Sequence, residues 1–297
     1  MTEAKVNSLP LAPPTRAPET FFAQVRRRFL KHRLAVLGLS ILALLAALAL
    51  LAPLLTPYGP DAQDVLLIGQ PRAPNLAHPL GTDQLGRDAL ARLLYGARVS
   101  LAVGLASALI STTLGTLVGA LAGFYRGMVE TLLMRFTDIV LSIPLLPLVI
   151  VLSGMLRPSV PLLVGIIGGL GWMGTARLVR GQFLSLREAE YVEATRALGG
   201  GNLRLILRHM LPNAIGPILV ATTLAVGNAI ILESALSFLG LGVQPPTPTW
   251  GNLLNSAREW LESAPWLALY PGLSILVTVL AVNFLGDGLR DALDPRT

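Results

Sequence analysis

Two carboxylates, Asp138 and Glu233, lie within long apolar stretches of this 297-residue chain. A charged group in hydrocarbon is costly and marks a functional position by default. Arg135 lies one helical turn before Asp138, so the sequence predicts an ion pair between these two side chains. Glu233 has no oppositely charged neighbour in the sequence. For both carboxylates, a place on a translocation path or at an interface with another subunit stays open as the functional alternative.

Other residue types that support catalysis or metal binding do not form a site. The chain has no cysteine, which excludes disulfides, thiolate catalysis and zinc–thiolate centres. Its histidines, His32, His78 and His209, lack the spacing of metal ligands. Its lysines, Lys5 and Lys31, belong to no glycine-rich phosphate-binding loop, and no Ser-His-Asp or zinc-protease pattern occurs. The sequence therefore predicts neither an enzyme nor a resident cofactor or metal, so any ATP would be hydrolysed by another chain.

The composition is that of a membrane protein. Hydrophobic residues make up 53% of the chain and charged residues 13%, with a mean hydropathy of +0.64. A soluble domain has about 25% charged residues. The net charge of +6 does not indicate nucleic-acid binding, because the basic residues lie between apolar stretches rather than in a stripe with aromatic residues. We therefore expect an all-α polytopic membrane protein.

The apolar stretches predict six transmembrane helices, one N-terminal helix and a core of five. The first stretch, residues 34–55, has no charge and is long enough to cross about 30 Å of hydrocarbon. It follows a polar tail, residues 1–33, and is interpreted as a retained anchor rather than a cleaved signal peptide. The core, residues 99–289, contains five further stretches, at 99–124, 131–155, 160–179, 214–239 and 267–289.

The distribution of lysine and arginine predicts the orientation in the membrane. With the N-terminus inside, the inner segments contain 16 basic residues and the outer segments contain 6. This bias places both termini in the cytoplasm. Residues 56–98 are then an excursion outside the membrane, and residues 290–297 are a short cytoplasmic tail.

Small residues recur at every fourth position of the second predicted helix. They are Ser107, Ser111, Gly115, Gly119 and Gly123. This spacing places them on one face of the helix, where they allow another helix to approach closely. We interpret the stripe as a packing face rather than as a transport-specific feature.

The connection at residues 187–212 is polar yet keeps a helical period. Residues 188–198 are expected to form a helix that ends at Gly199, Gly200 and Gly201, which can adopt the left-handed backbone of a C-cap. Asn202 is expected to cap a second short helix, whose length Pro212 limits. The apolar stripe of this second helix is Leu203, Ile206, Leu207 and Met210.

This connection resembles the "EAA" loop of permeases in binding-protein-dependent ABC importers. The matching positions are Glu193, Ala194, Gly199, Leu211 and Pro212, whereas Thr195 replaces an alanine and His209 an isoleucine. In that family the loop docks into a cleft of the ATPase subunit. The resemblance therefore implies that these seven residues couple the permease to ATP hydrolysis.

Further stretches are similar to the peptide and nickel branch of these permeases. They are residues 78–88, 93–101, 233–242 with 248–251, and 285–291 with 294–296. The likeness runs from about residue 20 to the C-terminus and favours the second permease of a heterodimeric pair. It implies half of a translocation pore in a bacterial inner membrane, with di- or oligopeptides as substrates and nickel or another small solute as the alternative.

The same resemblance implies the partners. They are a second homologous permease, two cytoplasmic ATPase subunits that hold ATP and Mg²⁺, an extracytoplasmic solute-binding protein and the lipid bilayer. A secondary transporter is the main rival class. It would need ion-coupling groups near the membrane midplane, often within inverted repeats, and the sequence shows neither a repeat nor a cluster of acidic residues there.

Overall fold

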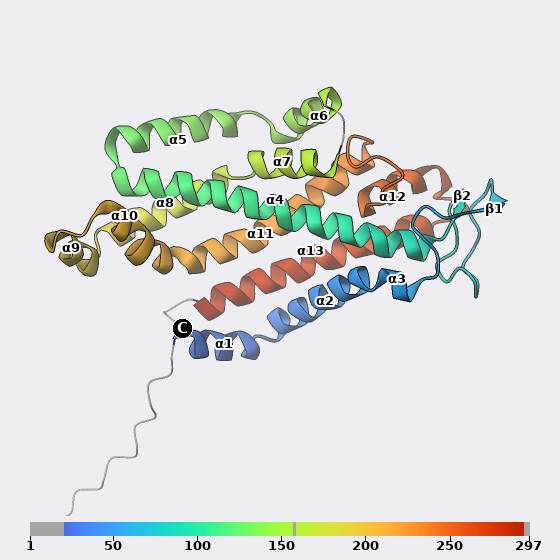
Figure 1. The fold of residues 1–297 in the computed structure, drawn as a ribbon, viewed down its shortest axis with the longest axis horizontal. Helices are drawn as coiled ribbons and strands as arrows, with labels where there is room; N and C mark the ends of the chain where they lie inside the picture. The colour runs from blue at the N-terminus through green and yellow to red at the C-terminus, as the bar shows by residue number, and fades with distance from the viewer. Residues whose placement is uncertain (1–20, 157–158, 294–297) are drawn as a thin grey trace, which may run out of the picture.

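The computed structural model describes residues 21–156 and 159–293. The first twenty residues of the predicted N-terminal tail lie outside this description, as do residues 294–297 of the predicted C-terminal tail. The described chain is a bundle of helices that run along one long axis (Figure 1). The predicted all-α fold is confirmed.

Four helices are long and apolar enough to cross a membrane. They are α2 (Arg33–Leu50), α4 (Ala89–Tyr125), the continuous helix at Asn202–Phe238, which includes α11 (Leu211–Phe238), and α13 (Trp266–Leu293). Two bent pairs also pass the same test. These are α5 (Gly127–Ser142) with α6 (Leu145–Met155), bent by 79°, and α7 (Val160–Leu170) with α8 (Met173–Arg187), bent by 42°. The described chain therefore has six spans, as predicted, if each bent pair is one span.

Proline and glycine lie at the two bends. Pro144 is the N-cap of α6, where its ring cannot donate the hydrogen bond that would continue α5. Gly171 is the C-cap of α7, and its amide still bonds to the carbonyl of Gly168. Such breaks are tolerated within a membrane where neighbouring helices or an aqueous path satisfy the backbone.

Helix α4 is the centre of the bundle and packs against α7, α8 and α11. Its glycines permit the contact with α8. A Cβ atom on Gly119 would lie 2.8 Å from the Cβ of Val179, and one on Gly123 would lie 2.6 Å from the Cβ of Phe183. The predicted packing face is therefore confirmed for the glycines of the small-residue stripe, whereas Ser107 and Ser111 belong to the wall of a cavity.

The two ends of the bundle differ in structure (Figure 1). Helices α1 and α9 lie at one end. The β1–β2 hairpin and α12 lie at the other. The remaining bounds are α1 (Phe21–Lys31), α3 (Ala52–Leu55), β1 (Gln63–Ile68), β2 (Leu85–Arg87), α9 (Glu190–Ala197), α12 (Trp250–Ala257) and a 3₁₀ turn (Arg258–Trp260).

Two helices extend beyond the predicted apolar stretches. Residues 21–31, assigned to the polar tail, form helix α1. Helix α4 begins at Ala89, ten residues before the predicted start, because Arg92 and Arg98 in its first turns interrupt the apolar run. The side chain of Asp88 caps it by accepting a hydrogen bond of 2.6 Å from the amide of Ala91.

Candidate coupling segment and translocation cavity

Helix α9 ends in a Schellman motif. Gly199 has φ +80°, its amide bonds to the carbonyl of Arg196, and the amide of Gly200 bonds to the carbonyl of Thr195. This pattern satisfies carbonyls that the helix end would otherwise leave unpaired. The predicted left-handed C-cap at Gly199 is confirmed. The helix itself is shorter than expected, since α8 extends to Arg187 and α9 begins at Glu190.

The second arm of the segment is not a separate helix. Gly201, not Asn202, is the N-cap of α10 (Asn202–Arg204). A π-helical stretch, Leu205–Met210, follows and continues into α11 without a break. Pro212 therefore does not end the arm as predicted, because it lies in the first turn of α11 directly after the widened π-helical turns.

One face of the segment is anchored and the other is exposed. Leu205 and Met210 are fully buried in a cluster with Phe183 of α8. Of the predicted apolar stripe, Met210 is buried, whereas Leu203 and Leu207 are 70% and 54% exposed. The four residues of the predicted stripe therefore differ in burial. Their exposure leaves an apolar surface at the end of the bundle.

The motif residues lie along this segment. Glu193 and Ala194 are exposed on α9, and the Thr195 hydroxyl donates a hydrogen bond of 2.7 Å to the carbonyl of Tyr191. His209 is partly buried in the π-helical stretch, where its carbonyl accepts a hydrogen bond of 2.6 Å from the side chain of Asn213.

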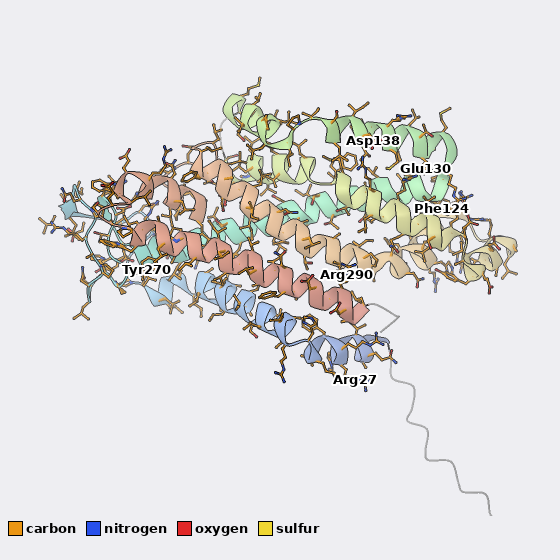
Figure 2. The ribbon with its side chains drawn as sticks, turned by 180° about the vertical axis from the view of Figure 1, so that it is seen from behind. Arg27, Phe124, Glu130, Asp138, Tyr270 and Arg290 are labelled. Atoms are coloured by element: carbon orange, nitrogen blue, oxygen red, sulfur yellow. The ribbon has the colours of Figure 1, made fainter. Side chains whose placement is uncertain are left out.

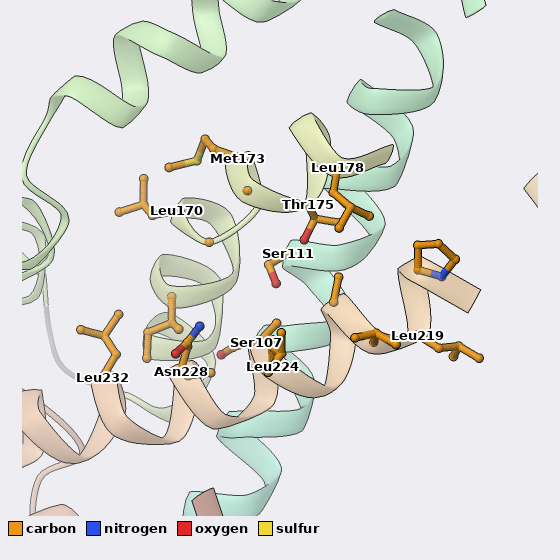
Figure 3. Close-up of a pocket in the computed structure, with 18 of the residues that line it drawn as sticks. Ser107, Ser111, Leu170, Met173, Thr175, Leu178, Leu219, Leu224, Asn228 and Leu232 are labelled. Carbon is orange, nitrogen blue, oxygen red and sulfur yellow. The ribbon is translucent and has the colours of Figure 1, made fainter. Parts of the chain in front are cut away.

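A partly open cavity of about 2140 Å³ lies between α4, α5–α6, α7–α8, α11 and α13. Its wall is mainly apolar. Its polar side chains are Ser107, Ser111, Thr175, Gln182, Asn213, Asn228 and Arg290. Figure 3 shows Ser107 and Ser111 of α4, Thr175 of α8 and Asn228 of α11 around this space. Among the described lining residues Arg290 is the one charged side chain, and no carboxylate belongs to the wall.

The segment 187–212 is continuous with the cavity wall. Leu211 and Pro212, the last two motif residues, belong to this wall at the start of α11. The π-helical stretch thus leads directly into a helix that lines the cavity.

The sequence matches a known family over most of this architecture. Residues 115–297 match the family described as "Binding-protein-dependent transport system inner membrane component". The chain belongs to this permease family. Residues 20–75 match the "N-terminal TM domain of oligopeptide transport permease C".

Two relatives extend the match over nearly the whole chain. The permease is 42% identical over 277 residues to the oligopeptide transport system permease protein OppC of Escherichia coli (strain K12), which covers 93% of this chain and 92% of the relative. It is 40% identical over 292 residues to the dipeptide transport system permease protein DppC of Alkalihalophilus pseudofirmus, which covers 97% of this chain and 95% of the relative. The permease is thus a multi-pass membrane protein of a transport family, and that family implies ATPase and binding-protein partners.

Asp138 pairs with a residue that sequence reasoning did not identify. Its Oδ1 accepts a hydrogen bond of 2.6 Å from Nη2 of Arg177 on α8. The predicted partner, Arg135, makes no ion pair with any residue that the structure describes, so this prediction was wrong. The reason is tertiary: α8 runs beside α5 and supplies an arginine that is 39 positions away in the sequence. Asp138 is half exposed and is not part of the cavity wall.

Glu233 lies neither on a translocation path nor at a surface that another subunit could contact, the two places that the sequence left open. Its side chain is fully buried within this chain, and it does not belong to the cavity wall. It accepts hydrogen bonds from the hydroxyls of Ser237 at 2.7 Å and Ser100 at 3.3 Å. Ser100 in turn accepts a bond of 3.1 Å from the amide of Trp250, so the carboxylate joins α4, α11 and α12.

Two features of the site escaped sequence reasoning. Asn228 faces the cavity from α11. In the sequence, the one feature that marks it is that it is a polar residue within an apolar stretch. Glu130 accepts a hydrogen bond of 2.6 Å from Nε of Arg180 on α8, a contact that no local spacing indicates. Within the described residues no group of three or more histidine, aspartate and glutamate side chains could hold a metal ion.

Proposed function

We propose that this permease forms one half of the pore through which an ATP-driven importer moves di- and oligopeptides. The observation that carries the substrate class is the pair of relatives, one named for dipeptide and one for oligopeptide transport, each matched over more than 90% of both chains. The mainly apolar cavity with its scattered hydroxyl and amide groups supports this proposal. Such a wall, in which Arg290 is the one charged side chain among the described lining residues, can hydrogen-bond a peptide backbone.

A second, homologous permease closes the open side of the cavity, and a solute-binding protein delivers the peptide from outside. Two ATPase subunits, which hold ATP and Mg²⁺, receive the segment 187–212 in a cleft. Its seven motif residues, from Glu193 to Pro212, are the coupling residues. The exposed side chains of Leu198, Leu203 and Leu207 on this segment support a docking role, since apolar exposure outside the membrane indicates an interface.

The protein lies in the bacterial inner membrane with α9 and both termini in the cytoplasm. The support is the excess of basic residues on the inner segments. Helix α1, with Arg26, Arg27, Arg28 and Lys31, lies at the same end as α9. The hairpin and α12 then face the binding protein outside.

The alternatives have less support. A nickel or other small-solute importer of the same branch would have the same fold, but the relatives described above carry peptide names. An ion-coupled secondary transporter would need titratable groups on the path. No carboxylate belongs to the described cavity wall, and Arg177 neutralises Asp138.

Reconstitution tests the proposal. The permease is purified with its copurifying subunits, placed in proteoliposomes and supplied with its binding protein. Radiolabelled dialanine and trialanine are compared with ⁶³Ni²⁺ as substrates. We expect uptake of a peptide that requires both ATP and the binding protein. Uptake by the permease without an ATPase partner would overturn the importer mechanism, and uptake of nickel alone would overturn the substrate class.

A further inference from the structure

Two ion pairs connect α5 with α8 at successive levels of the bundle. Nε of Arg180 donates to Oε1 of Glu130 at 2.6 Å, and Nη2 of Arg177 donates to Oδ1 of Asp138 at 2.6 Å. Figure 2 shows Glu130 and Asp138 on the same helix, α5. Each pair joins residues at least 39 positions apart in the sequence, so both are tertiary contacts.

Few residues of α5 are buried. Of its sixteen residues, all of which the structure describes, Thr137 is the one that is buried. Met128, Leu132, Phe136 and Ile139 are each more than half exposed. Apolar contacts to the start of α8 come from the ring of Phe136, which stacks on Trp172, and from Val140. The two ion pairs add to these contacts in fixing the position of α5 against α8.

The setting of these pairs differs from that of pairs on a soluble surface, which contribute little to stability. Helix α5 together with α6 is long and apolar enough to be a membrane span. A charge that loses its partner within such a span is costly, so breaking either pair should have a clear effect.

The helices that the pairs join have different tasks. Helix α8 leads within three residues into α9, the proposed ATPase contact. Helix α5 leads into the cavity wall, which includes Val140, Leu141 and the start of α6. We propose that the Glu130–Arg180 and Asp138–Arg177 pairs are the link that makes α5 and α6 follow α8 when the ATPases move α9. This inference rests on the proposed coupling role of α9, and it makes these four side chains positioning residues.

The first test measures the coupling ratio, which is the amount of ATP hydrolysed per molecule of trialanine taken up by the reconstituted transporter. Glu130→Gln and Asp138→Asn each remove one carboxylate. We expect the ratio to rise by roughly twofold to thirtyfold, the range typical of residues that transmit coupling. The charge-swapped variant Glu130→Arg with Arg180→Glu should restore it. Arg135→Gln is the matched control, because it removes a charge from α5 without breaking an ion pair between described residues.

The second test needs no transported substrate. Because the chain has no cysteine, the variant Leu132→Cys with Ser185→Cys carries one spin label on α5 and one on α8. In the complete transporter we expect the distance between the labels to stay constant between the nucleotide-free and the ATP–vanadate states. With Glu130→Gln and Asp138→Asn added, the distance should vary between these states.

The outcomes separate a failed link from a failed importer. Wild-type protein without ATP-driven trialanine uptake would contradict the proposed function itself. Normal wild-type uptake with an unchanged ratio in both single variants would overturn the link alone. So would a ratio that the swapped pair does not restore, or an α5–α8 distance that varies in the unsubstituted background. If a single variant fails to assemble, recovery of both assembly and ratio in the swapped pair supports the link, and failure of that recovery overturns it.

Discussion

Glu233 on α11 and Ser100 on α4 meet inside the permease at 3.3 Å, although 133 positions separate them in the sequence. The serine also accepts a hydrogen bond from the amide of Trp250, the first residue of α12. Gly251 makes this approach possible, because a Cβ atom there would lie 2.6 Å from the carbonyl oxygen of Ser234. The buried carboxylate thus fixes α12 to the bundle at the end opposite to α9.

Removing this carboxylate should destabilise the permease. Glu233→Leu leaves the buried hydroxyls of Ser100 and Ser237 without their acceptor, at a cost of about 1–3 kcal/mol. Glu233→Gln keeps one acceptor oxygen and should cost less. The measurement is thermal unfolding of the purified transporter. Glu262→Gln, an exposed carboxylate outside the membrane spans, is the control and should leave the midpoint unchanged. Equal midpoints for Glu233→Leu and the control would show that the carboxylate has no structural role.

Sequence reasoning worked where the determinant is local or periodic. The six spans follow from apolar length, and the stripe that includes Gly119 follows from a four-residue period. The C-cap at Gly199 follows from a glycine at the end of a helical pattern, because only the local backbone conformation decides it.

It failed where the determinant is tertiary. Arg177 is a better partner for Asp138 than Arg135 because α8 lies beside α5, which no local spacing reveals. Glu233 has a partner on another helix, Ser100 of α4, and the sequence around Glu233 does not reveal it. The cavity could not be predicted either, because its wall is assembled from helices far apart in the chain.

The close packing of α4 on α8 gives a second prediction. In Gly119→Val the new side chain would overlap with Val179 and with the backbone of α8. We expect a loss of stability of about 1–3 kcal/mol, typical of overpacking, with a lower yield of assembled transporter. Gly169→Val on α7 is the matched control, because a Cβ atom there meets nothing within 4 Å. Size-exclusion profiles and unfolding midpoints measure both variants, and equal behaviour would contradict close packing as the function of the stripe.

The charge on α9 gives a third prediction. Glu193 is exposed, and its reversal in Glu193→Lys should weaken the contact with the ATPase while membrane insertion stays normal. Glu262→Lys, the reversal of an exposed carboxylate outside the segment 187–212, is the control. Copurification of the ATPase with the tagged permease measures the contact. A normal ATPase yield with Glu193→Lys would argue against docking through this residue.

The turn after α9 allows a comparison between two glycine substitutions. The two glycines there differ in backbone conformation, but both have open space where a Cβ atom would lie. Gly199 has φ +80° and Gly201 has φ −67°, and a Cβ atom on either meets nothing within 4 Å. Valine at Gly199 must therefore pay for the left-handed backbone, about 1–2 kcal/mol, whereas valine at Gly201 has an ordinary extended conformation. Steric contact cannot explain any difference between the two variants.

We expect Gly199→Val to raise the ATP hydrolysed per peptide taken up, because the Schellman motif that holds α9 against the π-helical arm is strained or lost. Gly201→Val should keep the wild-type ratio. Both variants are assayed in proteoliposomes at equal amounts of assembled complex. If Gly199→Val keeps the wild-type ratio, the rigid connection at this turn does not transmit the motion of the ATPase. If both variants raise the ratio equally, flexibility of the glycine run, rather than the backbone of Gly199, is what coupling requires.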